Sequence, residues 1–419
     1  MSDPDVSPGP ATAPIPVLDA RPPVAAWRRA VFAGFLLSGL AVATWTSRIP
    51  VVQAELHLGV AQVGALITAV PIGSLVGVLL ASHVLHRFGA RTTVRTAAAG
   101  MAVAVAGLGA AASVAHSAPL AACALVLFGL SNSTTVIAVN VEAAALERAH
   151  GRTMLPLFHA TWSIGGFVGA GLGAAASAAG VPLAVHDGVV AAAVLVTGLL
   201  LAPSLPRRVE LAGRPAMGAL DRLLVWREPR VLGIALVVLG FAFIEGAANN
   251  WLAVGMVEAR GVSAAVGALM LSVFTLSMTV GRALGGRVVD RLGRMRSVRL
   301  SMLAAVLGIL VVVLVPWPAI AVAGVVVWGL GAALGYPLSM SAAADDPDGA
   351  PARVAAVATV GTVAQLGGPS IIGGLGSVVG VLHAFLLPMA ILATASLTTP
   401  ALRPPAGSTA ASVTAPRRA

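Results

Sequence analysis

The residues best suited to chemistry in this sequence are a few ionisable and amide side chains inside long apolar runs. Glu245 lies about 22 Å along a helix that starts with the run 231–255, which is past the middle of a bilayer towards its outer side. Asn249 follows one turn later on the same helix face. An acid at such a depth is costly, and it is functional by default. We therefore predict that Glu245 binds a proton or substrate, with pairing to Arg282 or simple lining of a cavity as alternatives.

Four further polar residues lie inside other apolar runs. Arg282, in the run 264–287, is either an arginine that snorkels or pins a helix, or a counter-ion to an acid or clamp on an anionic substrate. His159 is either a proton relay or a hydrogen-bonded structural histidine. Gln365 is expected to line the second half of a cavity, as is Tyr336.

The run 118–142 has an unusually polar middle. Asn132, Thr135 and Glu142 fall within about 80° of one another at 100° per residue. This spacing predicts a stripe facing a cavity, with hydrogen bonding between helices as the alternative. Glu142 lies near the inner rim, so it is either an acid of an inner gate or a proton carrier within the membrane.

The end of the first run carries an aromatic residue and an arginine on one stripe, Trp45 and Arg48. Arg48 is expected to anchor the helix at the membrane surface, and the alternative is a contact with substrate or with an outer gate. Trp45 is included with it as a candidate substrate contact.

The composition identifies the environment in which these residues work. Of 419 residues, 58% are hydrophobic and only 10% are charged, whereas soluble domains carry about 25% charged residues. This excludes an ordinary soluble enzyme, a disordered protein and a secreted disulfide scaffold, and the single cysteine, Cys123, excludes an intrachain disulfide. The chain has no lysine and hence no G-x-x-x-x-G-K loop for a nucleotide, so we expect neither an enzyme nor a bound cofactor or metal.

The apolar runs predict an all-α multi-pass membrane protein with twelve spans. Their approximate limits are 28–48, 60–82, 94–114, 118–142, 156–179, 185–203, 231–255, 264–287, 298–316, 318–342, 353–377 and 379–400. The resulting domains are a disordered tail (1–26), a six-helix bundle (27–203), a central loop (204–230), a second six-helix bundle (231–402) and a short tail (403–419).

All 26 basic residues are arginines, and their distribution predicts the orientation. With twelve spans, 23 of them fall on the side of the two termini and two, Arg48 and Arg260, on the other side. The positive-inside rule therefore places both termini in the cytoplasm. The arginines lie singly or in small groups between apolar runs, so we expect the lipid bilayer as a partner and no nucleic acid.

The two halves of the sequence repeat. Val63-Gly64-Ala65-Leu66 opens the second run and Val266-Gly267-Ala268-Leu269 opens the eighth. Matching spans at a nearly constant offset predict two pseudo-symmetric bundles. Parallel halves of this kind place a substrate site at their interface near the midplane.

One loop motif suggests a family. The sequence Gly286-Arg287-Val288-Val289-Asp290-Arg291-Leu292-Gly293-Arg294 resembles the G-x-x-x-D-R-x-G-R loop of the major facilitator superfamily (MFS). The first half keeps a degraded copy in Arg87, Gly89 and Arg91. The acid and arginines of such a loop are expected to form a latch across a cytoplasmic gap.

The resemblance covers residues 28–400 and extends to a sugar-permease-like bacterial branch, through Asn140-Val141-Glu142-Ala143, Phe158-His159 and Glu245-Gly246-Ala247. It implies a bacterial inner-membrane transporter, expected to be a monomer, that moves a small organic solute by alternating access with proton coupling. Efflux of a drug or metabolite is the alternative to nutrient uptake. A receptor that does not transport, built on the same fold, is a second alternative.

Overall fold

The computed structural model describes residues 22–150, 154–206, 224–346 and 349–403, and within these ranges all regular secondary structure is helical. Residues 1–21 and 404–419 of the predicted tails and most of the predicted central loop lie outside the described residues. The predicted N-terminal tail ends earlier than expected, because α1 already begins at Val24. The N-terminal half consists of α1 (Val24–Ser47), α2 (Ile49–Glu55), α3 (Val60–Ser113), α4 (Ala118–His150), α5 (Leu155–Ala178), α6 (Leu183–Leu201) and η1 (Ala202–Ser204). The C-terminal half consists of η2 (Val225–Arg227), α8 (Pro229–Arg260), α9 (Ala264–Leu292), α10 (Arg294–Leu314), α11 (Pro318–Ala332), α12 (Gly335–Ala343), α13 (Ala350–Val379), α14 (Val381–Ala384), α15 (Leu386–Ala395) and η3 (Ser396–Leu402).

Eleven stretches of the described residues are long and apolar enough to cross a membrane. Helix α5 is not among them, although it has 24 residues and occupies the place of the predicted fifth span. Its five glycines together with His159 and Ser163 lower its hydropathy. Those glycines serve packing, because a Cβ at Gly165 or Gly169 would lie within 2.4 Å of a backbone oxygen of α1. With α5 included, each of the twelve predicted runs corresponds to a helical segment.

Several helix limits differ from the predicted runs. Helices α4, α8 and α9 continue beyond their apolar stretches into charged sequence, because a helix does not have to end where the hydrocarbon ends. The second and third runs join in the single helix α3, which is kinked at Gly89 (φ 74°, ψ 168°). Gly293 has nearly the same conformation (φ 76°, ψ 159°) between α9 and α10. A positive φ favours glycine, so both halves make the same turn with the same residue type.

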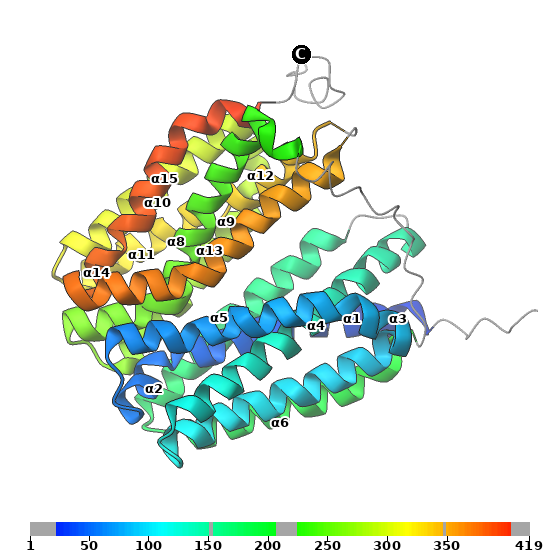
Figure 1. Cartoon of the computed structure of the whole chain (residues 1–419), viewed down its shortest axis with the longest axis vertical. Coiled ribbons are helices and arrows are strands. Elements are labelled where there is room, and N and C mark those ends of the chain that lie inside the picture. Colours follow the sequence, from blue (N-terminus) through cyan, green and yellow to red (C-terminus); the bar gives the residue numbers. More distant parts are fainter. Residues whose placement is uncertain (1–21, 151–153, 207–223, 347–348, 404–419) are drawn as a thin grey trace, which may run out of the picture.

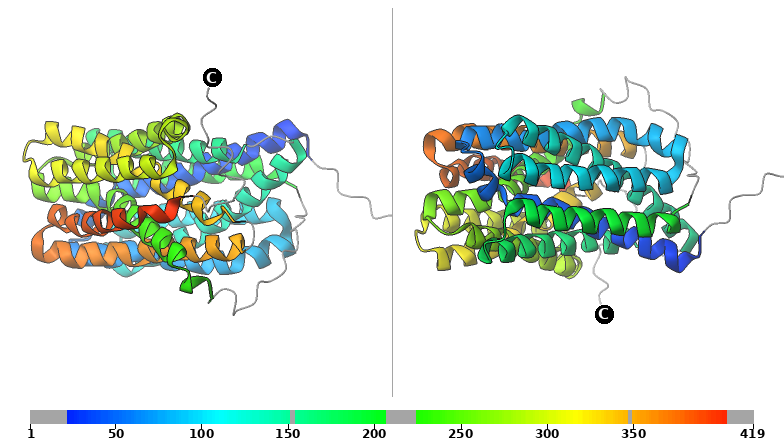
Figure 2. Two further views of the ribbon diagram at one scale, coloured as in Figure 1. Left: turned by 90° about the horizontal axis from the view of Figure 1, so that it is seen from above. Right: turned by 90° about the horizontal axis from the view of Figure 1, so that it is seen from below.

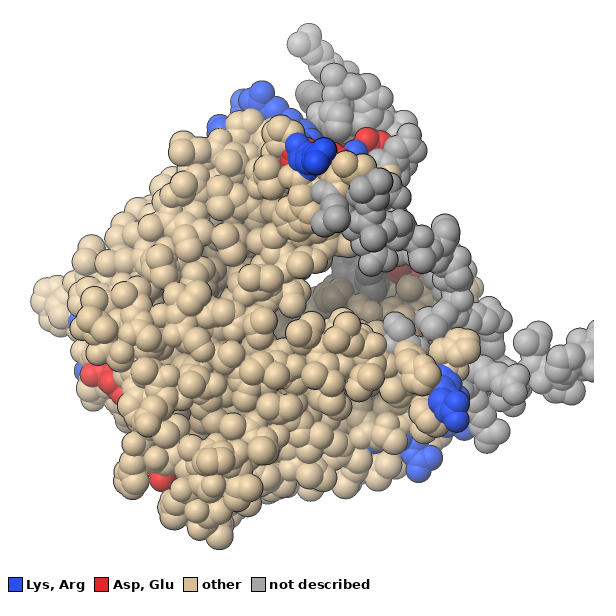
Figure 3. All heavy atoms as spheres, viewed as in Figure 1, with Lys and Arg blue, Asp and Glu red and all other residues tan. Residues whose placement is uncertain are grey.

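The two halves meet at one end of the molecule and diverge towards the other, as Figure 1 shows. We call these the closed end and the open end. The open end carries the Gly89 and Gly293 turns and the end of η3, and a hollow between the halves is visible there in Figure 3. Seen from above and from below, both halves consist of long helices that are packed lengthwise against one another (Figure 2).

Close backbone packing joins the halves at the closed end. A Cβ at Gly64 of α3 would lie 2.8 Å from the carbonyl oxygen of Pro369 and 3.1 Å from the Cα of Gly373 on α13. One turn further along α3, the hydroxyl of Thr68 lies 2.7 Å from that of Ser370. Gln53 of α2 also donates a hydrogen bond to Glu258 of α8. Small residues thus allow α3 and α13 to seal this end.

A cysteine pair tests the closed end. In a Cys123→Ser background, Thr68→Cys with Ser370→Cys is expected to form a disulfide under mild oxidation without any substrate, because the native hydroxyl oxygens are in contact. Peptide mass spectrometry of the purified protein measures the cross-link. The matched control pairs Thr68→Cys with Ile371→Cys, a position that is 49% exposed on the outer surface of the helix. Equal cross-linking of the two pairs contradicts the packing described here.

Candidate functional site

An ion pair lies inside the membrane-spanning region between two helices of the C-terminal half. Arg282 of α9 places Nη2 3.4 Å from Oε1 of Glu245 on α8. The side chains are 28% and 14% exposed. Glu245 lies near the middle of α8, not in its outer part as predicted, because α8 extends to Arg260 instead of ending near residue 255.

Arg282 also reaches the N-terminal half. Its Nη1 donates a hydrogen bond of 3.2 Å to the hydroxyl of Ser163 on α5, which is buried. His159 lies one turn earlier on the same face of α5, close enough to feel the charge of Arg282. The imidazole of His159 packs edge-on against Phe35 of α1 at a centroid distance of 5.1 Å. The arginine therefore links an acid of one half to a hydroxyl of the other.

A crevice between the halves extends from this pair towards the closed end. Asn249 faces it one turn beyond Glu245 and makes no hydrogen bond with any described residue. Tyr336 of α12 interacts electrostatically with Glu245. The crevice has mixed polar and apolar walls, as solute sites commonly do, and it is lined from α1, α5, α8 and α9 by Gly39, Val42, Ala43, Thr46, Trp162, Ser163, Gly166, Asn249, Leu271, Thr275 and Met278.

The polar stripe of α4 faces the interior of the N-terminal half and not this crevice. Thr135 and Glu142 are 5% and 2% exposed, and Thr135 donates a hydrogen bond to the carbonyl of Ser131. Asn132 is partly exposed, and its carbonyl oxygen has no partner among the described residues. Glu142 lies close enough to Trp27 of α1 to interact with it. Packing between helices, the alternative for this stripe, fits its surroundings.

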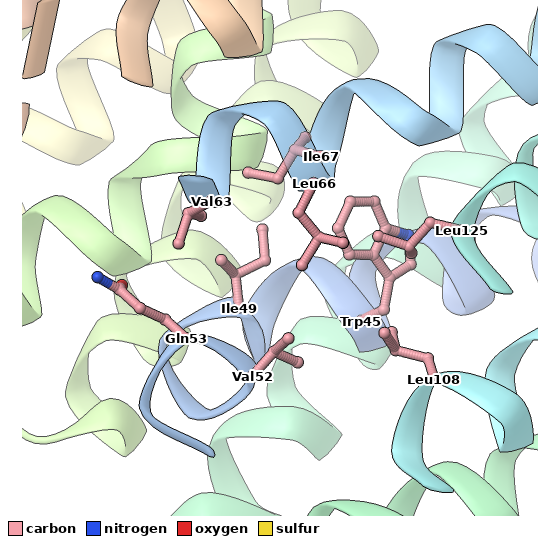
Figure 4. A pocket seen from close by; sticks show the side chains of 9 residues that line it. All are labelled: Trp45, Ile49, Val52, Gln53, Val63, Leu66, Ile67, Leu108 and Leu125. Carbon is pink, nitrogen blue, oxygen red and sulfur yellow. The ribbon is translucent and has the colours of Figure 1, made fainter. Parts of the chain in front are cut away.

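Trp45 and Arg48 lie near the closed end, within the N-terminal half. Trp45 is buried edge-on against Phe128 at 6.1 Å and lines a small apolar cavity with Ile49, Val52, Gln53, Val63, Leu66, Ile67, Leu108 and Leu125 (Figure 4). Arg48 is 2% exposed and donates hydrogen bonds to Ser177 and to the carbonyl of Val181. The residue expected as a surface anchor is thus an internal tie to the end of α5. Gln365 is exposed on α13, and no contact within the described chain joins it to the central pair.

The predicted latch residues of the second half point in different directions. Gly286, Asp290 and Arg291 are exposed at the open end, and neither charged group forms an ion pair with a described residue. Arg294, after the Gly293 turn, binds both carboxylate oxygens of Asp345 and the carbonyl of Leu402 at 2.7 Å. The expected bond across the gap is therefore replaced by bonds within the C-terminal half.

The first half repeats this use of an arginine. Arg91 donates to the carbonyls of Leu205 and Pro203 at the end of α6 and η1, while Arg87 is exposed and lies over Phe88. Arg91 and Arg294 thus each hold the end of the last span of their own half. Asp345 also accepts a bond of 2.7 Å from Arg230 and was not among the predicted site residues. Its place directly after the tenth span, on the arginine-rich side, is the signal that could have identified it.

The fold and this site define a membrane transporter built from two helical halves. The family profile described as Major Facilitator Superfamily matches residues 31–369, and the chain belongs to this family. It is a multi-pass membrane transporter and not an enzyme.

Relatives and solved structures agree with this assignment. The chain is 34% identical over 319 residues to "Uncharacterized transporter y4wD" of Sinorhizobium fredii, covering 76% of this chain and 82% of that protein. It is 30% identical over 342 residues to an "Uncharacterized MFS-type transporter" of Yersinia pestis, with coverages of 81% and 86%. The nucleoside transporter NupG superposes with a TM-score of 0.71 at 15% identity, covering 90% of this chain and 99% of that one. An inward-facing bacterial homologue of the human lysosomal transporter Spinster gives 0.70 at 15% identity, with coverages of 91% and 97%.

A double-mutant cycle tests the central ion pair. Glu245→Gln and Arg282→Gln are each expected to destabilise the protein by about 1–3 kcal/mol, because each leaves a partly buried charge without its partner. The double variant is expected to lose less stability than the two single variants added together, with a difference of about 0.5 kcal/mol or more. Reversible unfolding in mixed micelles measures these differences. Arg287→Gln, on the same helix but exposed at the open end, is the control and is expected to have little effect; strict additivity argues against the pair.

Proposed function

We propose that this transporter moves a small polar organic solute by alternating access and couples the movement to protons through the Glu245–Arg282 pair. The observation that carries the proposal is the placement of Arg282, which contacts an acid of the C-terminal half and a hydroxyl of the N-terminal half at once. A change in the charge of Glu245 therefore acts directly on a contact between the halves.

The coupling step follows from the cost of unpaired charge in lipid. With Glu245 ionised, Arg282 has a counter-ion and is held against Ser163. A proton on Glu245 cancels the negative charge of its carboxylate. Arg282 is then stabilised by binding a polar or anionic group of the solute. Protonation and solute binding thus favour the same arrangement, and they shift the balance between the two conformations only through this difference in affinity.

The crevice supplies the contacts that position a solute. Asn249 offers an amide donor and acceptor without a protein partner, and Trp162 of α5 adds an apolar face. Thr46 and Thr275 add hydroxyl groups from α1 and α9. This mixture favours a small solute with several hydrogen-bonding groups.

The arginine distribution supports an orientation with the open end in the cytoplasm. Arg87, Arg91, Arg291 and Arg294 lie at that end, whereas Arg48 and Arg260 lie at the closed end, and basic side chains flank the hollow in Figure 3. In this orientation the structure is open to the inside and both termini are cytoplasmic.

Replacing the acid separates solute exchange from proton coupling. In proteoliposomes, with a solute taken from a metabolite exchange screen, Glu245→Gln is expected to keep exchange at equal pH. It is expected to lose accumulation driven by a pH gradient by at least about tenfold, because glutamine cannot carry the proton. Glu258→Gln on the same helix is the control, since it still accepts the bond from Gln53. Undiminished accumulation in Glu245→Gln removes this residue from coupling.

Replacing the amide tests solute contact alone. Asn249→Ala is expected to weaken solute binding about 5- to 30-fold, the cost of one or two hydrogen bonds, with an unchanged pH dependence. Radiolabelled exchange at several solute concentrations measures the apparent KM. Asn250→Ala is the matched control, because Asn250 donates to the carbonyl of Gly246 in its own helix. A solute affinity that falls equally in both variants contradicts a direct contact by Asn249.

A further inference from the structure

A second group of ionisable side chains lies near the closed end, entirely within the N-terminal half. It consists of Arg48, directly after α1, and the neighbours His186 and Asp187 in the first turns of α6. Their exposed fractions are 2%, 8% and 0%. None of the three contacts the Glu245–Arg282 pair, so this group needs its own explanation.

The carboxylate of Asp187 is buried without a hydrogen-bond donor. Neither of its oxygens has a hydrogen-bond partner among the described residues, and both ring nitrogens of His186 are likewise without one. The closest ionisable atom is Nδ1 of His186, 3.4 Å from Oδ1. On the other side, α3 presents Gly109, where a Cβ would lie 3.2 Å from Oδ2. A carboxylate enclosed in this way is costly as an anion and is stable with a proton.

Arg48 is a cation close to Asp187, but its hydrogen bonds go to other groups. Its Nη1 donates 2.6 Å to the hydroxyl of Ser177 and its Nη2 donates 2.8 Å to the carbonyl of Val181, while Nε has no partner. It feels the charge of Asp187 without forming an ion pair with it. The remaining charged neighbour of the group is Glu55 of α2, which acts on Arg48.

We propose that His186 and Asp187 form a second proton-binding site, and that loss of its proton draws Arg48 from Ser177 and Val181 to the Asp187 carboxylate. In this proposal the proton sits on the Asp187 carboxyl, with the His186 imidazole beside it, and the guanidinium of Arg48 carries the net charge of the three groups. When the proton leaves to water at the closed end, the carboxylate becomes an anion. The guanidinium is then its nearest available counter-ion, and the group becomes neutral overall.

Moving Arg48 from Ser177 and Val181 to Asp187 changes a contact between two helices. Arg48 ties the end of α1 to the end of α5, and α1 and α5 both line the central crevice. Releasing Ser177 and Val181 loosens this tie on the side where the halves are sealed. The site thus makes the N-terminal half sensitive to pH at the closed end, independently of Glu245.

Infrared titration of the purified protein in nanodiscs tests the site without a substrate. The wild-type protein is expected to show a protonated carboxylic acid that persists well above the pH at which exposed acids ionise. Asp187→Asn is expected to lose this component, and Glu245→Gln and Glu142→Gln are expected to keep it. A spectrum of Asp187→Asn identical to that of the wild type overturns the proposal.

A second variant tests the arginine exchange with the acid left in place. Ser177→Ala removes the hydroxyl that holds Arg48 in the described conformation. The state with an ionised Asp187 therefore becomes more stable relative to the state with a protonated Asp187. The titration midpoint of the same component is expected to fall by about one pH unit, the effect of one hydrogen bond to a charged group. Ser163→Ala, which removes the hydroxyl bonded to Arg282, is the matched control and is expected to leave this midpoint unchanged. An unchanged midpoint in Ser177→Ala refutes the exchange even if Asp187→Asn does not fold.

Discussion

The architecture depends on one constraint: a charge within the bilayer is costly unless it has a partner, and here the partner comes from a neighbouring helix. Glu245 and Arg282 satisfy this constraint for each other, and Arg282 has donors left for Ser163. The arginine that pairs with Glu245 therefore also links the two halves. Both side chains remain partly exposed, which the proposed proton coupling through this pair requires.

The two ends of the molecule are held by different kinds of contact. At the closed end, Gly64 and Gly373 let α3 and α13 approach until their backbones touch. At the open end, Arg91 and Arg294 hold the last span of their own half. The bonds of Arg91 and Arg294 stay within a half, whereas the contact of Gly64 with Gly373 crosses between the halves. Such an arrangement allows each half to move as a unit while the contacts between them change.

The sequence predicted the fold well because the bilayer leaves few choices. Backbone groups in lipid must bond within a helix, so apolar runs translate directly into spans, and the repeat gives the two halves. The site was harder to predict. Helical spacing shows which residues share a face, as for Thr135 and Glu142, but the rotation of each helix against its neighbours decides what that face meets. Asp187 was missed because an acid near the end of an apolar run is usually exposed, and only the packing of α3 and α6 buries it.

Helix α5 connects the two charged groups. Two arginines from other segments end on serines of this helix, Arg282 on Ser163 and Arg48 on Ser177, and the two serines lie about 21 Å apart along its axis. Its glycines pack it against the backbone of α1, so both serines belong to a helix that is held in close contact with its neighbour. This packing also explains why α5 carries five glycines, which lower its hydropathy although its 24 residues are long enough to cross a membrane. In this helix, close approach to α1 takes precedence over apolar side chains.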